Sequence, residues 1–138
     1  MNKNKAQEIR LEHILGDEHL KVSEESLRIY RVFLQRQITF PCELTGREDF
    51  QWEEEYLFGH GDKNEYEQLK LSKPSYSDIY TYMSFEDKID SADGLRVKVK
   101  RISDLKQFVL PLSDLKVADT THQNYNLIHD YAVWFFNN

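Results

Sequence analysis

The spacing of hydrophobic residues changes several times along the chain, and each change predicts a different element. Residues 1–20 are mostly polar with isolated aliphatic positions, and we expect a short helix that ends at Gly16. Residues 23–38 carry apolar side chains at helical spacing behind Ser23, a residue type that caps helix N-termini. The first part of the chain is therefore predicted to be helical.

Beyond residue 38 the period falls to two, the spacing of a strand with one buried face. Five segments show this alternation: 40–46, 50–58, 78–87, 95–102 and 105–111. The pattern of 95–102 places Leu95, Val97 and Val99 inside and Arg96, Lys98 and Lys100 outside. The pattern of 78–87 places Ile79, Thr81, Met83 and Phe85 on one face. A sheet of about five short strands follows from these segments.

The C-terminal residues return to helical spacing. Residues 120–136 are expected to form a helix that Asp119, Thr120 or Thr121 caps. Its inner stripe would consist of Tyr125, Ile128, Ala132 and Phe135. The predicted class is therefore α+β, with short antiparallel strands that form a small barrel or a strongly curved sheet between terminal helices.

Composition narrows the class of protein. The chain has 138 residues, the size of one ordinary domain, and we expect a single domain over 1–138. Within it we expect a polar N-terminal segment at 1–22 and a mobile loop at 59–78. The net charge of −6 argues against nucleic-acid binding, which needs a basic face.

The remaining compositional signals concern location. No run approaches the ~18 to 20 apolar residues of a membrane span, and the first residues lack the apolar core of a signal peptide. The single cysteine, Cys42, excludes an intrachain disulfide and has the apolar flanks of a core residue. We therefore expect a cytoplasmic protein with no membrane partner.

Acidic side chains gather beside large aromatic residues in the stretch 46–62. The acidic candidates are Glu48, Asp49, Glu53, Glu54 and Glu55. On a strand, Glu53 and Glu55 would share one face, and Glu48 and Asp49 would fold over it from the preceding turn. Calcium takes six to eight oxygen ligands, largely carboxylates and carbonyls, so this pattern is typical of a cation site. The same pattern is also typical of a solvated edge strand, and the basic face of 95–102 with Arg101 would then neutralise it across the sheet.

Motifs for catalysis are missing. The sequence contains no P-loop, no G-x-G-x-x-G and no G-x-S-x-G elbow, and the five histidines lack zinc-ligand spacing with cysteine. The turn "DSADG" at 90–94 fails the EF-hand pattern, because Ala92 and Gly94 stand where acidic ligands are needed. We do not expect an enzyme.

Two separated segments resemble one family, the CcbP-type calcium-binding proteins, named for a cyanobacterial member. They are "YRVFLQRQITFPCEL" at 30–44 and "FVLPLSDLKVADTTHQNYNLIHDYAVWF" at 108–135. The matching positions are Phe40, Pro41, Pro111, Leu112, Leu115, Asp119, Thr121, Asp130, Tyr131 and Trp134. Tyr131 stands where a tryptophan is usual, and 46–94 is longer than in the family. The resemblance implies an SH3-like barrel with flanking helices and Ca²⁺ binding by surface carboxylates.

Two functional hypotheses follow. The first is a small cytosolic Ca²⁺ buffer or sensor that uses Glu48, Asp49, Glu53 and Glu55, with Glu54 and Asp119 as further candidates. The second is a metal-free, immunity- or antitoxin-like module whose acidic, aromatic surface binds a basic protein partner. Its anchors would be Trp52, Tyr56, Tyr66, Tyr76, Tyr80 and Tyr82. A calcium-dependent rise in stability is expected only for the first.

Overall fold

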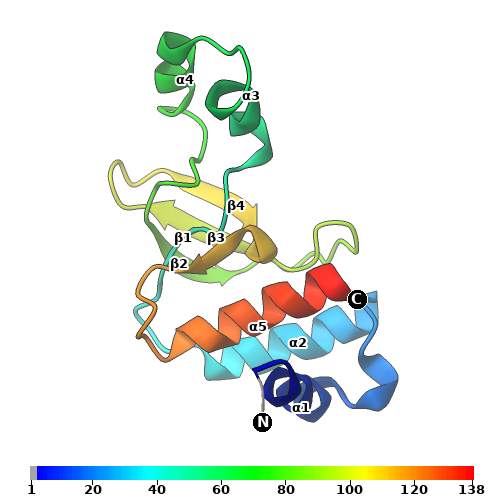
Figure 1. The fold of residues 1–138 in the computed structure, drawn as a ribbon. Coiled ribbons are helices and arrows are strands. Elements are labelled where there is room, and N and C mark those ends of the chain that lie inside the picture. Colours follow the sequence, from blue (N-terminus) through cyan, green and yellow to red (C-terminus); the bar gives the residue numbers. More distant parts are fainter. Residues whose placement is uncertain (1–2) are drawn as a thin grey trace.

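The computed structural model describes residues 3–138 and divides into a helical layer, a sheet and a projecting connection (Figure 1). The helical layer contains α1 (Lys3–Leu15), the 3-10 turn η1 (Asp17–His19), α2 (Glu24–Gln37) and α5 (Asn124–Asn137). The sheet contains β1 (Glu43–Gly46), β2 (Tyr80–Phe85), β3 (Arg96–Arg101), β4 (Gln107–Pro111) and β5 (Leu115–Val117). The 3-10 turn η3 (Leu112–Asp114) joins β4 to β5.

The predicted helix at 23–38 is confirmed as α2, together with its cap. The backbone N–H of Ser26 donates to Ser23 Oγ, and the N–H of Ser23 donates to Ser26 Oγ, so two otherwise unpaired donors are satisfied. Leu27, Tyr30 and Leu34 face inward at helical spacing and are buried. Local sequence therefore determines this helix.

The cap predicted for the C-terminal helix is wrong. Helix α5 begins at Asn124, and its N-cap Gln123 makes no side-chain bond to the helix. Asp119 instead accepts from the backbone N–H and the hydroxyl of Thr121, which closes a turn before the helix. In the predicted inner stripe Ile128 and Ala132 are buried, whereas Tyr125 and Phe135 are only half-buried.

The sheet is antiparallel and open, with the strand order β4-β3-β2-β1-β5. The closed barrel implied by the resemblance is not found, because β4 and β5 lie at opposite edges and do not pair with each other in the described chain. Strand β5 has only three residues, and α5 packs against it and η3. A helix that covers a short edge strand shields the unpaired backbone groups of that edge, so the sheet does not need to close into a barrel.

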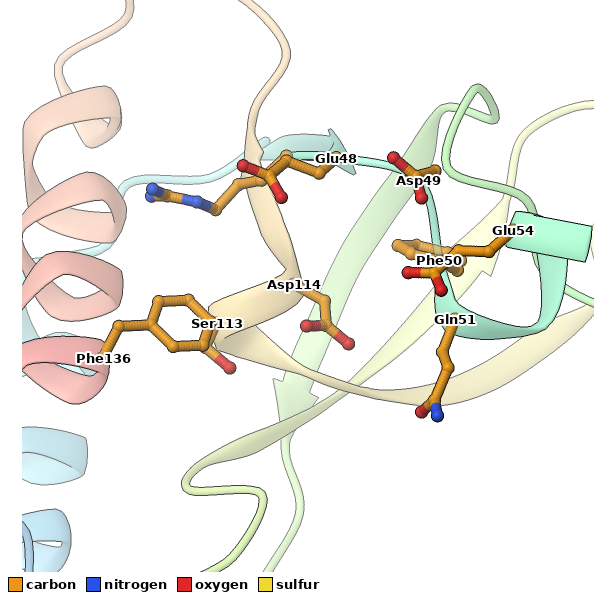
Figure 2. A pocket seen from close by; sticks show the side chains of 9 residues that line it. Glu48, Asp49, Phe50, Gln51, Glu54, Ser113, Asp114 and Phe136 are labelled. Atoms are coloured by element: carbon orange, nitrogen blue, oxygen red, sulfur yellow. The ribbon is translucent and has the colours of Figure 1, made fainter. Parts of the chain in front are cut away.

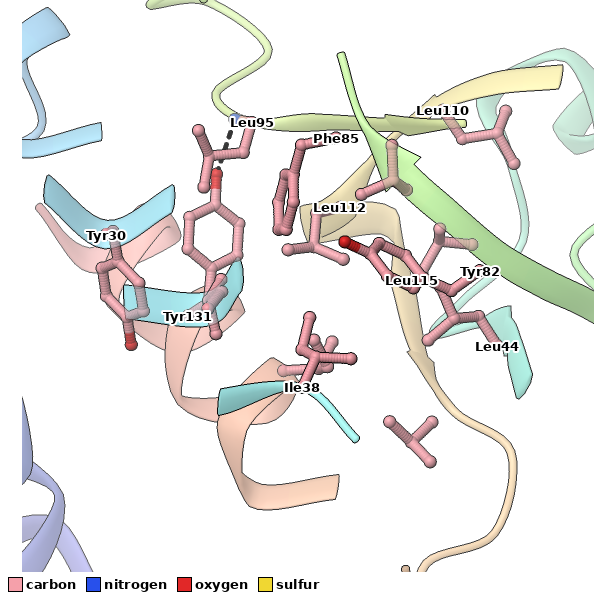
Figure 3. Close-up of a cluster of buried hydrophobic side chains, with 14 of the residues drawn as sticks. Tyr30, Ile38, Leu44, Tyr82, Phe85, Leu95, Leu110, Leu112, Leu115 and Tyr131 are labelled. Carbon is pink, nitrogen blue, oxygen red and sulfur yellow. Dashed lines mark hydrogen bonds between the residues drawn. The ribbon is translucent and has the colours of Figure 1, made fainter. Parts of the chain in front are cut away.

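The core fills the space between the sheet and helices α2 and α5 (Figure 3). Tyr131 of α5 packs edge-on against Tyr30 of α2, with ring centroids 5.2 Å apart. The Tyr131 hydroxyl accepts a 2.8 Å hydrogen bond from the N–H of Leu95, which joins α5 to the start of β3. Leu95, Val97 and Val99 are buried, as predicted.

The buried face predicted for 78–87 is only partly right. Tyr80, Tyr82 and Phe85 are buried, whereas Met83 is exposed. A register shift between Tyr82 and Ser84 explains the difference, because an extra residue in one strand reverses which side chains face the core. Phe85 is thus correctly predicted, but the residues before the bulge are not.

The β1–β2 connection, residues 47–78, differs most from the prediction. The expected strand at 50–58 is instead the 3-10 turn η2 (Gln51–Glu53) and α3 (Glu54–Leu57), and the expected loop contains α4 (Lys63–Leu69). Trp52 and Tyr56, four residues apart, pack against Tyr66 with centroids 5.7 and 5.3 Å away. A spacing of four suits a helix as well as a strand, so tertiary stacking decides between them. The mobility of 59–78 stays a prediction.

A close approach of Gly46 and Tyr76 fixes the start of this connection. The N–H of Gly46 donates to the Tyr76 carbonyl at 2.9 Å, and a side chain at Gly46 would lie 2.6 Å from the Tyr76 Cα. Only glycine permits so close an approach of two backbones.

Among residues 3–138, no helix is long and apolar enough to cross a membrane.

Candidate functional site

The predicted acidic ligands separate into three environments. Glu48, Asp49 and Glu54 line a hollow of about 570 Å³ at the edge of the sheet. Glu53 is fully buried nearby, Glu55 is exposed outside the hollow, and Asp119 lies elsewhere. The stretch that looked continuous in sequence is therefore not one site in space.

The hollow is formed where β1 leaves the sheet beside η3 (Figure 2). The register of β1 and β5 pairs Gly46 with Leu115, and the N–H of Arg47 donates to the Asp114 carbonyl at 2.9 Å. This pairing brings the acidic turn after β1 next to the carboxylate of Asp114. The lining residues are Arg47, Glu48, Asp49, Phe50, Gln51, Glu54, Ser113, Asp114 and Phe136.

Asp114 is the site residue that the sequence analysis missed. It belongs to the Pro-Leu-x-x-Leu turn, which was interpreted only as a fold signal. Its pKa is raised, first because the carboxylate is partly withdrawn from water and then because the negative charge of Asp93 acts on it. A carboxylate with a raised pKa in an acidic hollow is one that a cation would stabilise.

The side chains that line the hollow offer oxygen atoms, the ligand type that suits a hard cation. Four carboxylates and the amide oxygen of Gln51 supply oxygen ligands, which Ca²⁺ and Mg²⁺ prefer. Figure 2 shows the carboxylates of Glu48, Asp49, Glu54 and Asp114 placed around the hollow rather than directed at one point. Among the described residues, no three acidic, histidine or cysteine side chains are close enough to hold an ion. The oxygen donors are present, but they are not assembled.

Arg47 is the positive charge in this lining. Its Nη1 atom lies 3.4 Å from Nδ1 of His129 on α5, so the guanidinium is held toward the helix. This contact leaves the carboxylates of the hollow without a direct guanidinium bond among the interactions of the described chain.

Glu53 has a different role, because four donors surround its carboxylate. Oε2 accepts from the backbone N–H groups of Phe50 and Tyr76 at 3.2 and 3.0 Å. Oε1 accepts from the hydroxyls of Tyr66 and Ser75 at 3.0 and 2.5 Å. These bonds join η2, α4 and the segment before β2. Glu53 therefore holds the β1–β2 connection together and does not line the hollow.

Asp119 lies at the far end of the β1–β5 pair. Gly46, next to the hollow, pairs with Leu115, whereas Asp119 follows Val117 at the other end of β5. Its bonds to Thr121 lower the pKa of its carboxyl. The structure thus places Asp119 apart from Glu48, Asp49 and Glu54.

The basic strand face does not pair with the acidic stretch as expected. Lys98 contacts Glu86, 3.8 Å away, and Arg96 contacts Asp93 at 3.9 Å. Arg101, only 3% exposed, forms ion pairs with Asp78 and Asp104. Its guanidinium also donates to the carbonyls of Lys70, Leu71 and Lys73.

This arrangement makes Arg101 a second clamp on the β1–β2 connection. The sequence placed Arg101 with the exposed basic face of 95–102, and this prediction is wrong because the side chain is buried. A buried guanidinium needs several acceptors at once, and the folded connection supplies most of them, with Asp104 of the turn after β3 supplying the rest. Arg101 in turn lowers the pKa of Asp104 to about 2.

The aromatic anchors proposed for a protein partner are largely packed inside the molecule. Tyr66, Tyr80 and Tyr82 are buried, and Trp52 donates its Nε1–H to the Pro74 carbonyl at 2.7 Å. Phe58, which was not among these proposed anchors, is 77% exposed. Most of the aromatic signal therefore reflects internal packing.

Comparison with known proteins places the fold. No family model matches the chain, and no curated protein matches it significantly. The structure is similar to the crystal structure of Anabaena CcbP, with a TM-score of 0.62. The likeness is one of fold. It covers 97% of this chain and 92% of the other at 17% sequence identity. The sequence resemblance to CcbP-type proteins is thereby confirmed at the level of the fold.

Proposed function

We propose that the protein binds Ca²⁺ in the hollow beside η3 and acts as a calcium buffer or sensor. The observation that carries the proposal is the gathering of four carboxylates, from Glu48, Asp49, Glu54 and Asp114, around one hollow. The resemblance to calcium-binding CcbP-type proteins and the shared fold support it. The hollow is built from three segments that meet only in the folded chain, so an ion there would bind the native state selectively.

The residues of the hollow have distinct roles in this proposal. Asp114 and Asp49 flank the backbone contact between β1 and η3 and would form the fixed part of the site. Glu48, Glu54 and Asp114 are all exposed, and the longer side chains of Glu48 and Glu54 would rotate inward to complete the ligand set. The ion would replace repulsion between carboxylates by coordination and would tie the β1–β2 connection to η3.

The unassembled ligand set favours Ca²⁺ over Mg²⁺. Calcium accepts six to eight oxygens in flexible geometry, whereas magnesium demands a near-ideal octahedron and releases its water reluctantly. Side chains that must be ordered on binding reduce the affinity, because their rotamer freedom is lost. We therefore expect a weak, calcium-selective site.

Thermal unfolding with EDTA, Mg²⁺ or Ca²⁺ tests the proposal. A ligand at 100 times its Kd stabilises a native state by about 2.7 kcal/mol, and about 3 °C per kcal/mol is typical at this size, so the melting temperature should rise by roughly 8 °C. The double variant Glu54→Gln/Asp114→Asn should lose this rise.

The matched control is Glu55→Gln, which removes the same charge from the adjacent residue, outside the hollow, and should keep the response to calcium. If the melting temperature of the folded wild type does not respond to Ca²⁺, the proposal is wrong. If the rise survives in Glu54→Gln/Asp114→Asn, the ion binds elsewhere.

The alternative, an acidic module for a basic protein partner, is favoured by one observation. Phe58 is exposed next to the exposed carboxylates of Glu54 and Glu55, an apolar anchor with an acidic rim. A folded protein without any calcium response would direct attention to this surface. Loss of binding to a basic partner in Phe58→Ser would then support the alternative.

A further inference from the structure

Arg47 brings a positive charge to the carboxylates that line the acidic hollow (Figure 2). Its backbone N–H donates to the carbonyl of Asp114 at 2.9 Å, so the main chain of Arg47 is fixed beside a residue whose carboxylate lines the hollow. The side chain takes another direction, because Nη1 donates to Nδ1 of His129 on α5 at 3.4 Å. Arg47 is thus anchored next to the carboxylates, but its guanidinium is bonded to a helix.

The imidazole of His129 is held in a defined orientation. It stacks on the ring of Tyr125, one helical turn earlier in α5, with the ring centroids 5.8 Å apart and an angle of 9° between the planes. A guanidinium can only donate hydrogen bonds, so Nδ1 must be the unprotonated nitrogen of a neutral ring, and Nε2 carries the proton. The contact therefore specifies one tautomer of His129.

A second position is open to the guanidinium of Arg47. Rotation about the bonds of this half-buried side chain would bring it to the carboxylates of Glu48 or Asp114 while the main chain stays in place. An exposed ion pair and a neutral hydrogen bond contribute similar, small free energies. The two positions are therefore close in free energy, and loss of the acceptor on His129 is enough to change which one is occupied.

The position of this guanidinium matters for any cation in the hollow. A guanidinium bonded to Asp114 or Glu48 would occupy oxygen atoms that Ca²⁺ needs, and its charge would repel the ion at short range. While the guanidinium is bonded to α5, the carboxylates keep these oxygen atoms for the ion. The contact between Arg47 and His129 thus connects the helical layer to the hollow.

We propose that His129 holds the guanidinium of Arg47 away from the hollow and thereby sets the affinity of the hollow for Ca²⁺. Arg47 and His129 are positioning residues in this inference, since neither is a ligand of the ion. The inference rests on the proposed calcium site. It adds an arginine that competes with the ion and a histidine that restrains the arginine.

Calorimetric titration of the full chain with Ca²⁺ tests this role. His129→Leu removes the acceptor and releases Arg47, so it should weaken Ca²⁺ binding by about fivefold. His129→Asn places an oxygen acceptor near the position of Nδ1 and should restore most of this affinity. The double variant Arg47→Met/His129→Leu has no guanidinium at this position and should bind Ca²⁺ at least as tightly as the wild type.

The double variant separates competition by Arg47 from damage to the fold. If distortion of α5 caused the loss in His129→Leu, the additional Arg47→Met substitution would not restore binding, and the inference would be wrong. An unchanged affinity in His129→Leu would refute the role of His129 but leave the calcium site intact. A wild type that binds no Ca²⁺ would instead refute the proposed calcium site, and the inference with it.

A second measurement depends neither on calcium nor on the folding of His129→Leu. Nitrogen NMR spectra of the metal-free wild type, with neutral imidazoles, should show the proton of His129 on Nε2 and a hydrogen-bonded Nδ1. Arg47→Met should shift the Nδ1 resonance toward that of an unbonded nitrogen. His122 is the matched control, because its Nδ1 accepts from the N–H of Asn124 at 3.0 Å and should not change. A proton on Nδ1 of His129 would exclude the contact with Arg47 and overturn the inference.

Discussion

Replacement of Glu53 by glutamine should show that this residue stabilises the fold and does not bind the ion. The carboxylate is inaccessible to solvent and receives four hydrogen bonds. Glutamine has nearly the same shape, but one of its two terminal atoms donates rather than accepts. Whichever way the amide turns, two of the four surrounding donors meet an N–H₂ group.

The magnitude follows from which donors can adapt. The hydroxyls of Tyr66 and Ser75 rotate, whereas the backbone N–H groups of Phe50 and Tyr76 do not, so the amide oxygen should stay with the backbone. The contribution of each of these two backbone bonds to stability then decreases from the ~1.5–3 kcal/mol of a charged hydrogen bond to the ~0.5–1.5 kcal/mol of a neutral one. With up to about 1 kcal/mol for each reversed hydroxyl, Glu53→Gln should lower the free energy of unfolding by about 2 to 4 kcal/mol.

Urea denaturation measures this change directly, and thermal unfolding should show a fall of roughly 6 to 12 °C. The neighbours provide controls, because Glu54→Gln and Glu55→Gln alter exposed carboxylates and should stay within about 0.5 kcal/mol without calcium. If Glu53→Gln were as mild as Glu55→Gln, the four-donor arrangement would have no energetic importance and the reasoning would fail.

Four other substitutions test the polar groups of Arg101, Asp104, Tyr131 and Tyr30. Arg101→Met should lower the free energy of unfolding in urea by on the order of 3 kcal/mol, since it leaves carboxylates and carbonyls without their buried donor. The pKa of Asp104 is held at about 2, below the ordinary value near ~3.9. The ion pair with Arg101 therefore stabilises the fold above about pH 4. This stabilisation is lost as the pH falls toward 2 and the carboxylate takes up a proton. Asp104→Asn should accordingly flatten stability between these pH values in an acid titration followed by circular dichroism. Tyr131→Phe should cost about 1 to 3 kcal/mol because the Leu95 N–H loses its acceptor, whereas Tyr30→Phe should be neutral or stabilising in the same denaturation assay.

The elements that the sequence predicted correctly are those with local causes. Helix α2 follows from Ser23 and a helical apolar stripe, and β3 follows from strict alternation of Leu95, Val97 and Val99. Helices at both ends with five antiparallel strands between them are also found, although the sheet is open and α3 and α4 separate β1 from β2. These features depend on neighbours within a few residues, which the sequence displays directly.

The β1–β2 connection is a segment whose secondary structure the local spacing of residues does not decide. Trp52 and Tyr56 fit a strand of period two and a helix with contacts at four residues equally well. The stacking against Tyr66 and the bonds to Glu53 select the helix, and both come from residues more than nine positions away in sequence. Asp114 lines the acidic hollow for a similar reason, because only the pairing of β1 with β5 places it beside the turn after β1.

The sequence by itself determined the acidic character of 48–55 and the oxygen ligands that these side chains offer, and it showed that the turn at 90–94 fails the EF-hand pattern. Only the tertiary structure decided what each carboxylate does. Glu53, Glu54 and Glu55 are identical and consecutive, yet one is buried, one lines the hollow and one faces solvent. Side chains on a helical turn diverge by about 100° per residue, so neighbours point to different surroundings. Distant donors on Tyr66, Ser75 and Tyr76 decide which of the three is enclosed.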